Sequence, residues 1–199
     1  PFVGLENQTG RTCSHKIGVW IDGQISWLDN GDWNIQIDYQ PETLVSQITA
    51  INQKIAIELR FMDAVYNEKN IFIRKIFLKN LAKNSRQIKI FLGQQFMLAE
   101  TGRGNTAYYD PDTQTIIHYK GERVFLVSAK CDGVDFADYS IGLFNLEGKE
   151  GTWKDAEDGQ LLKNNIEHGS VDSIIGFTFH VEPNATQVLY YWLAVGGWQ

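Results

Sequence analysis

The sequence predicts an all-β domain built from two packed antiparallel sheets, with little helix. Apolar and polar residues alternate with a period of two across residues 55–62, which places one face of a strand on a core. Turn-forming residues recur at short intervals and separate runs rich in β-branched and aromatic residues. Only the polar stretch 149–169 has a partly helical or loop-like pattern, so a helical or βαβ architecture is not expected.

The first half of the chain supplies five expected strands. Asp22 and Gly23 suit a tight type I′ turn, so they predict a hairpin between residues 17–21 and 24–28. The next three strands are separated by polar turns and comprise residues 55–62, 71–78 and 87–96. These three are expected to form an antiparallel meander.

The second half continues the pattern. Asp110, Pro111 and Asp112 predict a turn between residues 108–109 and 116–119, because proline presets φ and aspartate bonds its own backbone. The other expected strands are residues 124–128, 171–181 and 187–195. Roughly a dozen strands make an outsized sandwich, since common sandwiches use about 100 residues.

Length and charge limit the class of protein. The 199 residues predict one domain spanning 1–199, large enough to fold without a disulfide or a metal. The formal charge of −6 argues against nucleic acid as a partner, since such a groove needs a basic stripe. No apolar stretch reaches the length of a spanning helix, so no membrane association is expected. We expect a soluble protein and favour the cytoplasm, although the sequence does not determine the compartment.

The sequence contains no recognisable catalytic motif and predicts no cofactor. The four histidines lack zinc-protease spacing, and nucleophile-elbow and P-loop patterns are missing. The densest acidic cluster holds Asp155, Glu157 and Asp158, which could bind calcium through oxygen ligands or form a first helical turn. Its spacing does not fit an EF-hand, so a solvated loop is the better interpretation and no metal site is predicted.

Aromatic residues leave a sugar-binding role open. Trp33, Trp153 and Trp198 lie outside the expected strands and are the candidates for exposed platforms on which a sugar ring could stack. Trp20 and Trp192 lie within strand runs, where filling of the core is expected.

Six segments in order resemble a known family. They read TCSHKIGVWIDGQISW at residues 12–27, FIRK at 72–75, NTAYYDP at 105–111, HYKG at 118–121, DAEDG at 155–159 and EHGSVDS at 167–173. Together they resemble the N-terminal domain of prokaryotic glucoamylases and their glucodextranase and trehalase relatives, glycoside hydrolases of family 15.

The resemblance implies a fold and a division of labour. It implies a galactose mutarotase-like β-supersandwich, joined in the parent chain to an α/α barrel that carries both catalytic carboxylates of an inverting hydrolysis. No residue here matches those carboxylates, so this chain is expected to be noncatalytic and to support and pack on the barrel. The positions expected to contact the barrel or a sugar are Tyr108, Tyr109, His118, Tyr119, Trp153, Asp155 and Asp158.

Three alternatives remain at this stage. The chain could be a carbohydrate-binding module that recognises α-glucans, with Trp33 or Trp153 as the platform. It could be a sugar-modifying enzyme of mutarotase-like shape, which requires histidine and carboxylate side chains in a sheet concavity. An exposed interdomain face of roughly 600 to 1,500 Å² would also favour a homodimer of the isolated domain.

Overall fold

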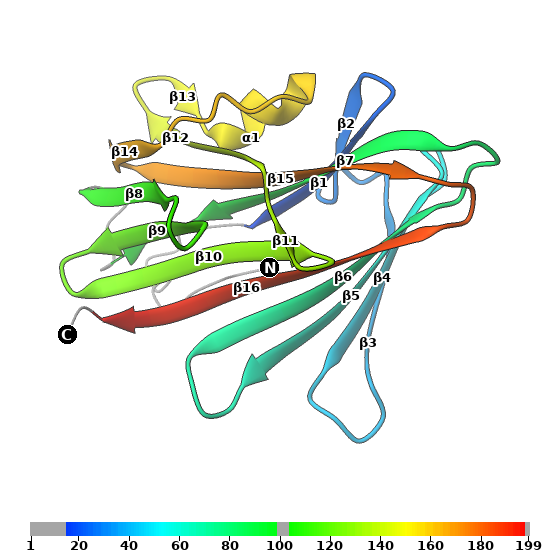
Figure 1. Cartoon of the computed structure of the whole chain (residues 1–199), viewed down its shortest axis with the longest axis horizontal. Helices are drawn as coiled ribbons and strands as arrows, with labels where there is room; N and C mark the ends of the chain where they lie inside the picture. The colour runs from blue at the N-terminus through cyan, green and yellow to red at the C-terminus, as the bar shows by residue number, and fades with distance from the viewer. Residues whose placement is uncertain (1–14, 99–103, 198–199) are drawn as a thin grey trace.

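Two antiparallel sheets pack face to face in the computed structural model, which describes residues 15–98 and 104–197 (Figure 1). The six-stranded sheet has the order β13-β12-β15-β7-β1-β2. Its strands are β1 (Lys16–Ile21), β2 (Gln24–Trp27), β7 (Arg86–Gln95), β12 (Asp138–Leu146), β13 (Lys149–Glu150) and β15 (Val171–Val181). The predicted all-β class is confirmed.

The larger sheet has ten strands in the order β14-β8-β9-β10-β16-β6-β5-β4-β3, with β11 paired to β10. Its strands are β3 (Asn34–Tyr39), β4 (Ser46–Asn52), β5 (Ile57–Tyr66), β6 (Ile71–Asn80), β8 (Asn105–Asp110), β9 (Thr115–Lys120), β10 (Arg123–Cys131), β11 (Val134–Asp135), β14 (Ile166–Gly169) and β16 (Thr186–Gly197).

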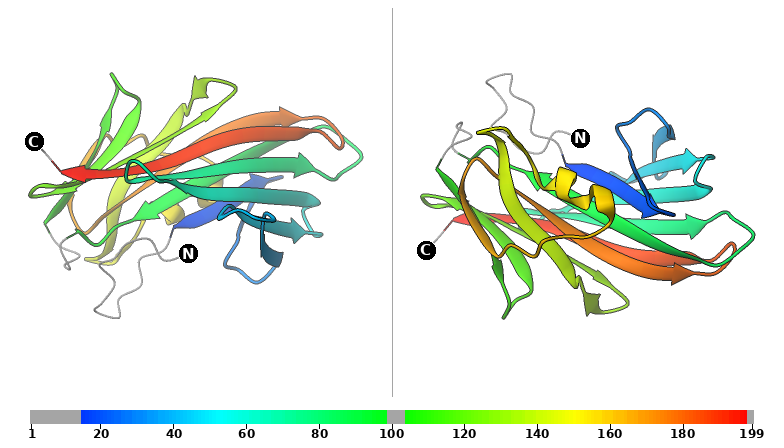
Figure 2. Two further views of the ribbon diagram at one scale, coloured as in Figure 1. Left: turned by 90° about the horizontal axis from the view of Figure 1, so that it is seen from below. Right: turned by 90° about the horizontal axis from the view of Figure 1, so that it is seen from above.

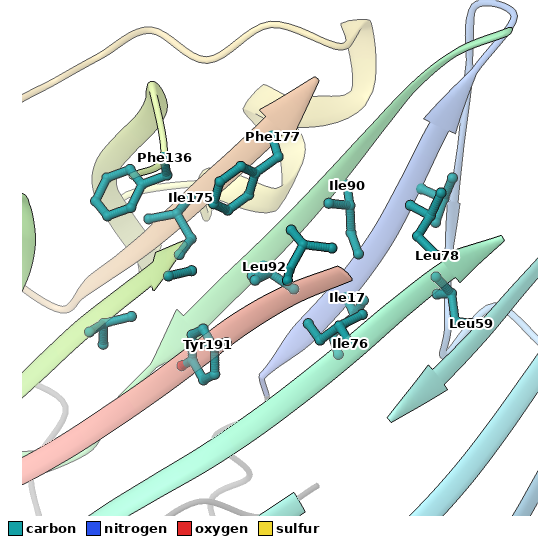
Figure 3. Close-up of a cluster of buried hydrophobic side chains, with 14 of the residues drawn as sticks. Ile17, Leu59, Ile76, Leu78, Ile90, Leu92, Phe136, Ile175, Phe177 and Tyr191 are labelled. Carbon is teal, nitrogen blue, oxygen red and sulfur yellow. The ribbon is translucent and has the colours of Figure 1, made fainter. Parts of the chain in front are cut away.

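The hydrophobic core fills the space between the sheets (Figure 3). Ile90 and Leu92 of β7 point toward Ile76 of β6 and Tyr191 of β16. Leu59 of β5 is fully buried, as its period-two alternation predicts. Each sheet therefore turns one set of alternate side chains inward.

A second, smaller core covers the outer face of the six-stranded sheet. The short α1 (Thr152–Asp155) and the 3₁₀ turn η3 (Ala156–Asp158) lie over this face, as Figure 2 shows from above. The buried members of this second core are Trp27, Phe91, Ala156, Leu161 and Ile174. No helix within the described residues is long and apolar enough to cross a membrane.

Both predicted hairpins form, but the expected meander is wrong. Asp22 and Gly23 have φ of 52° and 81°, as the predicted type I′ turn between β1 and β2 requires. Strands β5 and β6 pair, whereas β7 crosses to the other sheet and pairs with β1 and β15. Residues 90–94 of β7 are buried on both faces, so the strand occupies the middle of a covered sheet.

Sequence patterns missed several elements. Strands β3, β4 and β12 were not predicted, and in β3 every residue is exposed. The helical turn begins at Thr152 rather than at Asp155, and β14 forms within the stretch that was expected to be helix or loop. Trp192 lies on the outer face of the large sheet rather than in the core, because its neighbours Tyr191 and Leu193 are the residues that turn inward.

Candidate functional site

The seven predicted site residues do not form one site. Four of them lie on β8 and β9 of the large sheet, whereas Trp153, Asp155 and Asp158 lie in α1 and η3 over the small sheet (Figure 1). Within the first group, Tyr108 and Tyr119 face outward, and Tyr109 and His118 face the interior. The predicted residues therefore belong to two separate groups, one on β8 and β9 and the other on α1 and η3.

Tyr108 and Tyr119 form an aromatic pair on the outer face of the large sheet. Their ring centroids are 6.2 Å apart and nearly perpendicular, a favourable edge-to-face arrangement. Burial raises the pKa of the Tyr108 phenol, with a smaller contribution from Asp110. Both rings are half-buried, so this pair is available to a contact surface.

Tyr109 closes one part of the sandwich instead of facing solvent. Its ring stacks on Tyr139 with centroids 4.1 Å apart, and it meets Phe136 edge-on at 5.9 Å. The hydroxyl of Tyr139 also bonds Asn165. Tyr109 thus joins strand β8 to β12 through Tyr139 and to Phe136, which precedes this strand.

His118 belongs to a buried hydrogen-bonded chain. The amide of Gln94 donates to the carbonyl of Leu92 at 2.7 Å, and its Oε1 accepts from Ser173 Oγ at 2.9 Å. His118 Nε2 lies 2.8 Å from the same Oγ. Because the serine hydrogen is used toward Gln94, Nε2 carries the proton and donates to Ser173.

The histidine and serine do not form a catalytic pair. Ser173 is fully buried and His118 is 1% exposed, so no substrate reaches them. Burial lowers the pKa of His118 to about 3, which keeps the ring neutral. The chain instead connects β9 with β15 and β7 across the interior.

A partly buried ion pair lies in the large sheet. Arg74 donates from Nε and Nη2 to the carboxylate of Asp63 at 2.7 and 2.6 Å, and Asp63 stands directly opposite in the sheet. Tyr191 stands opposite Arg74 on the other side, and burial raises its pKa strongly. His15 Nε2 is buried without a hydrogen-bond partner, and burial followed by Arg74 lowers the pKa of its ring to about 3.

Trp153 and the acidic turn serve mainly local contacts. The Trp153 indole donates to the carbonyl of Glu150 at 2.9 Å, and its ring meets Trp27 edge-on at 6.4 Å. Asp155 accepts the backbone N–H of Leu162 at 3.0 Å, and Asp158 accepts that of Gln160 at 2.8 Å. These two carboxylates therefore fix their own loop.

Of the two other predicted tryptophan platforms, the structure tests only Trp33. Trp33 is 7% exposed and donates its indole N–H to Ser26 at 3.0 Å, so its prediction as an exposed platform is wrong. The Ser26 hydroxyl also accepts from the amide of Asn52 at 3.1 Å, so the Trp33 indole is held against buried polar side chains. Trp198 lies outside the described residues.

Among the described residues, the histidines and carboxylates do not assemble a mutarotase-like centre. His168 is exposed and bonds Thr106 at 2.8 Å, and His180 is exposed 3.8 Å from Glu182. Within residues 15–98 and 104–197, no three His, Cys, Asp or Glu side chains converge in a way that could hold a metal ion.

A cleft of about 560 Å³ opens where β15 runs past the start of β12. Phe177 and Phe179, whose rings stack 5.8 Å apart, form part of its wall. Asp138 and Lys163 supply charge to the lining, and burial raises the pKa of the Asp138 carboxyl against the opposing effect of Lys163 and Lys89.

The most extensive candidate surface was missed by sequence reasoning. Seven apolar residues stand side by side on the outer face of the large sheet, in register across seven strands from β14 to β5. This outer row consists of Ile166, Tyr108, Ile117, Leu126, Ala194, Ile71 and Tyr66. Directly opposite residues of an antiparallel pair share a face, so the row is continuous.

Further aromatic and basic residues border the outer row. Trp192 pairs with Ile73 on the same face, and Tyr190 pairs with Lys75. The ammonium of Lys75 lies 5.3 Å from the ring centroid of Tyr190 and 5.0 Å from that of Phe77. The outer face is therefore apolar along its middle and basic along one side.

Comparison with known proteins relates this fold to glycosyl hydrolases. No family model matches the chain. It is 25% identical over 162 residues to an uncharacterized glycosyl hydrolase of Methanocaldococcus jannaschii, which is 81% of this chain and 25% of that protein. A bacterial glucoamylase complexed with acarbose superposes with a TM-score of 0.74 at 14% identity, over 93% of this chain and 27% of that chain. This chain has the fold of a glucoamylase β-domain. It spans about a quarter of the length of each relative.

In this glucoamylase-type β-domain, the segments that carried the resemblance supply buried contacts more than surface ones. FIRK contributes Arg74 to the ion pair, and HYKG contributes His118 to the hydrogen-bonded chain. EHGSVDS contributes Asp172, which accepts the backbone N–H of Thr152 at 2.7 Å, and DAEDG contributes Gly159, which packs against Trp20. The motifs therefore specify the fold.

Proposed function

We propose that this chain is the noncatalytic β-domain of a glucoamylase-like glycosyl hydrolase, and that it supports an α/α-barrel catalytic domain. The observation that carries the proposal is the fold match, which covers 93% of this chain but only 27% of the glucoamylase. The distant glycosyl hydrolase relative supports it in the same way, since the match covers 25% of that protein.

The chemistry of the described residues is consistent with this role. Inverting hydrolysis needs two carboxyl groups that face each other across a sugar at roughly 6.5 to 9.5 Å. Asp155 and Asp158, the carboxylates of the predicted site, each accept a backbone N–H of their own loop. His118 and Ser173 have acid-base chemistry but lie within the core.

The direct test is hydrolysis by the 199-residue chain. Maltose, isomaltose and trehalose should show no turnover above a buffer blank, whereas the full-length parent protein should cleave an α-glucoside with inversion at the anomeric carbon. Turnover by the 199-residue chain alone would overturn the proposal. A parent gene that encodes no catalytic domain would overturn it too.

A carbohydrate-binding module is the second candidate, and the cleft beside β15 supports it. Saccharide sites combine an apolar ring surface with a few polar groups. In this cleft the phenylalanine pair supplies the ring surface, and the polar groups include Asp138, Lys163 and Gln187. Titration with maltooligosaccharides, followed by chemical shifts in the NMR spectrum, tests this candidate. Saturable shifts at Phe177 and Phe179 would support it, and no saturable change up to millimolar sugar would remove it.

A further inference from the structure

The outer face of the large sheet has the wrong composition for a surface that stays in water. Antiparallel sheets that face solvent on one side alternate hydrophobic inward and polar outward residues. Here the outward positions hold the outer row, with Trp192, Ile73 and Tyr190 beside it. Ile166 and Tyr66 at the two ends of the row are 59% and 42% exposed, and Tyr190 and Ile73 beside it are 45% and 39% exposed, whereas Ile117 within the row is only 7% exposed. The apolar surface is therefore open at both ends of the row and along its border.

The charge on this face narrows the choice of partner. The chain carries 24 acidic and 18 basic residues, yet the outward positions of the central strands β9, β10, β16 and β6 include no carboxylate, whereas Asp110 and Glu58 on the same face lie on the flanking strands β8 and β5. The central strands present Lys130, Lys75 and Lys79 instead. Lys130 forms an ion pair with Asp135 at 3.1 Å. Among the described residues, the ammonium of Lys75 contacts aromatic rings and no carboxylate.

We propose that the outer row is the surface on which the catalytic domain of the parent protein docks, with a carboxylate of that domain placed on Lys75. This inference rests on the proposed function. Three quarters of the length of both relatives lies outside the matched region, so the proposed parent has a large domain to cover this face. Apolar surface in the middle with a charged rim is the usual anatomy of a specific interface.

A second copy of this chain fits the face less well. It would present the same outer row and the same basic border, and no outward carboxylate of the central strands would reach Lys75. Figure 2 shows the face from below, with β16 in red toward the viewer. Because β16 lies in the middle of the large sheet, a domain centred on this strand covers the row on both sides.

The test uses the full-length parent protein and a zero-length carbodiimide crosslinker. This reagent joins a lysine ammonium to a carboxylate only when the two are in contact. Mass spectrometry of the digest should identify an amide between Lys75 and an Asp or Glu of the catalytic domain. A Lys75 crosslink confined to the β-domain, one to a second copy, or none at all would overturn the docking surface.

Matched variants separate the surface from general effects. Ile73→Lys puts a charge into the proposed interface, and we expect at least about a tenfold loss of the Lys75 crosslink because an unpaired buried charge is costly. Ile37→Lys makes the same change on the inner side of edge strand β3, where Ile37 is 72% exposed, and should leave the yield unchanged. Equal yields for the two variants would overturn the proposal.

The outcomes for the two proposals are distinguishable. A gene without a catalytic domain removes both the proposed function and its docking partner. A catalytic domain that is present and active, but whose carboxylates do not reach Lys75, removes only the docking surface. Unfolding of the isolated Ile73→Lys and Ile37→Lys domains by urea verifies that each variant is folded.

Discussion

Acid should destabilise this domain chiefly through its buried histidines, and His118 provides the cleanest measurement. Burial lowers the pKa of His118 to about 3, against 6.5 for a histidine exposed to water. The stabilising contribution of the neutral ring is therefore fully present above pH 6.5 and is lost as the pH falls toward 3. The full difference of 3.5 pKa units corresponds to about 5 kcal/mol.

A measurable part of this loss in the free energy of unfolding occurs between about pH 7.5 and 5. Between pH 7.5 and 5, linkage gives a loss of about 2 kcal/mol in the free energy of unfolding from His118 alone. His15 adds a loss of the same sign. Asp172 acts oppositely, since burial raises its pKa to about 6 and its contribution is present below pH 3.8 and lost as the pH rises through 6.

Replacement of His118 by glutamine isolates the contribution of His118 to the pH dependence of stability. His118→Gln keeps a donor for Ser173 but does not titrate, so its free energy of unfolding should fall by about 2 kcal/mol less than that of the wild type between pH 7.5 and 5. The contributions of His15 and Asp172 cancel in this comparison. Urea titrations followed by far-UV circular dichroism at the two pH values supply the measurement.

The control is His168→Gln, because His168 is exposed and its ring bonds Thr106 on the neighbouring strand. This variant should retain the acid sensitivity of the wild type. An unchanged acid loss in His118→Gln would show that the buried ring is not the titrating group, and the reasoning would be refuted.

Three further substitutions test the packing. Gly159→Ala should lower the free energy of unfolding by at least about 2 kcal/mol, since φ is 82° and an added Cβ would lie 2.5 Å from the Trp20 ring; a loss below 0.5 kcal/mol in urea titration would contradict this. Arg74→Met should cost about 3 to 5 kcal/mol because Asp63 loses its partner, whereas Arg74→Met combined with Asp63→Leu should recover part of the loss in the same assay. Trp33→Ala should cost about 3 to 5 kcal/mol and leave any maltooligosaccharide affinity unchanged in calorimetry, whereas lost affinity in a folded variant would restore Trp33 as a platform.

Local sequence determined the β class and the sharpest turns of this protein. Asp22 and Gly23 adopt positive φ at little cost, so the first hairpin follows from two residues. Alternation across β5 identified a strand with one buried face, because a period of two needs no knowledge of the partner strands. The resemblance to glucoamylases rested on segments whose residues make buried contacts, and this explains why the predicted fold was right.

Other features depended on which strands become neighbours. The outer row joins Ile166, Tyr108 and Ile71, which are far apart in the chain, and only the pairing of seven strands brings its members into line. The sequence could not show that β7 leaves its neighbour β6 for the other sheet. Nor could it show that Trp33 turns inward, because its bond to Ser26 depends on how the loop after β2 folds, and Ser26 is held in turn by Asn52 of β4. Periodicity is a property of one segment, whereas register and burial belong to the assembled sheets.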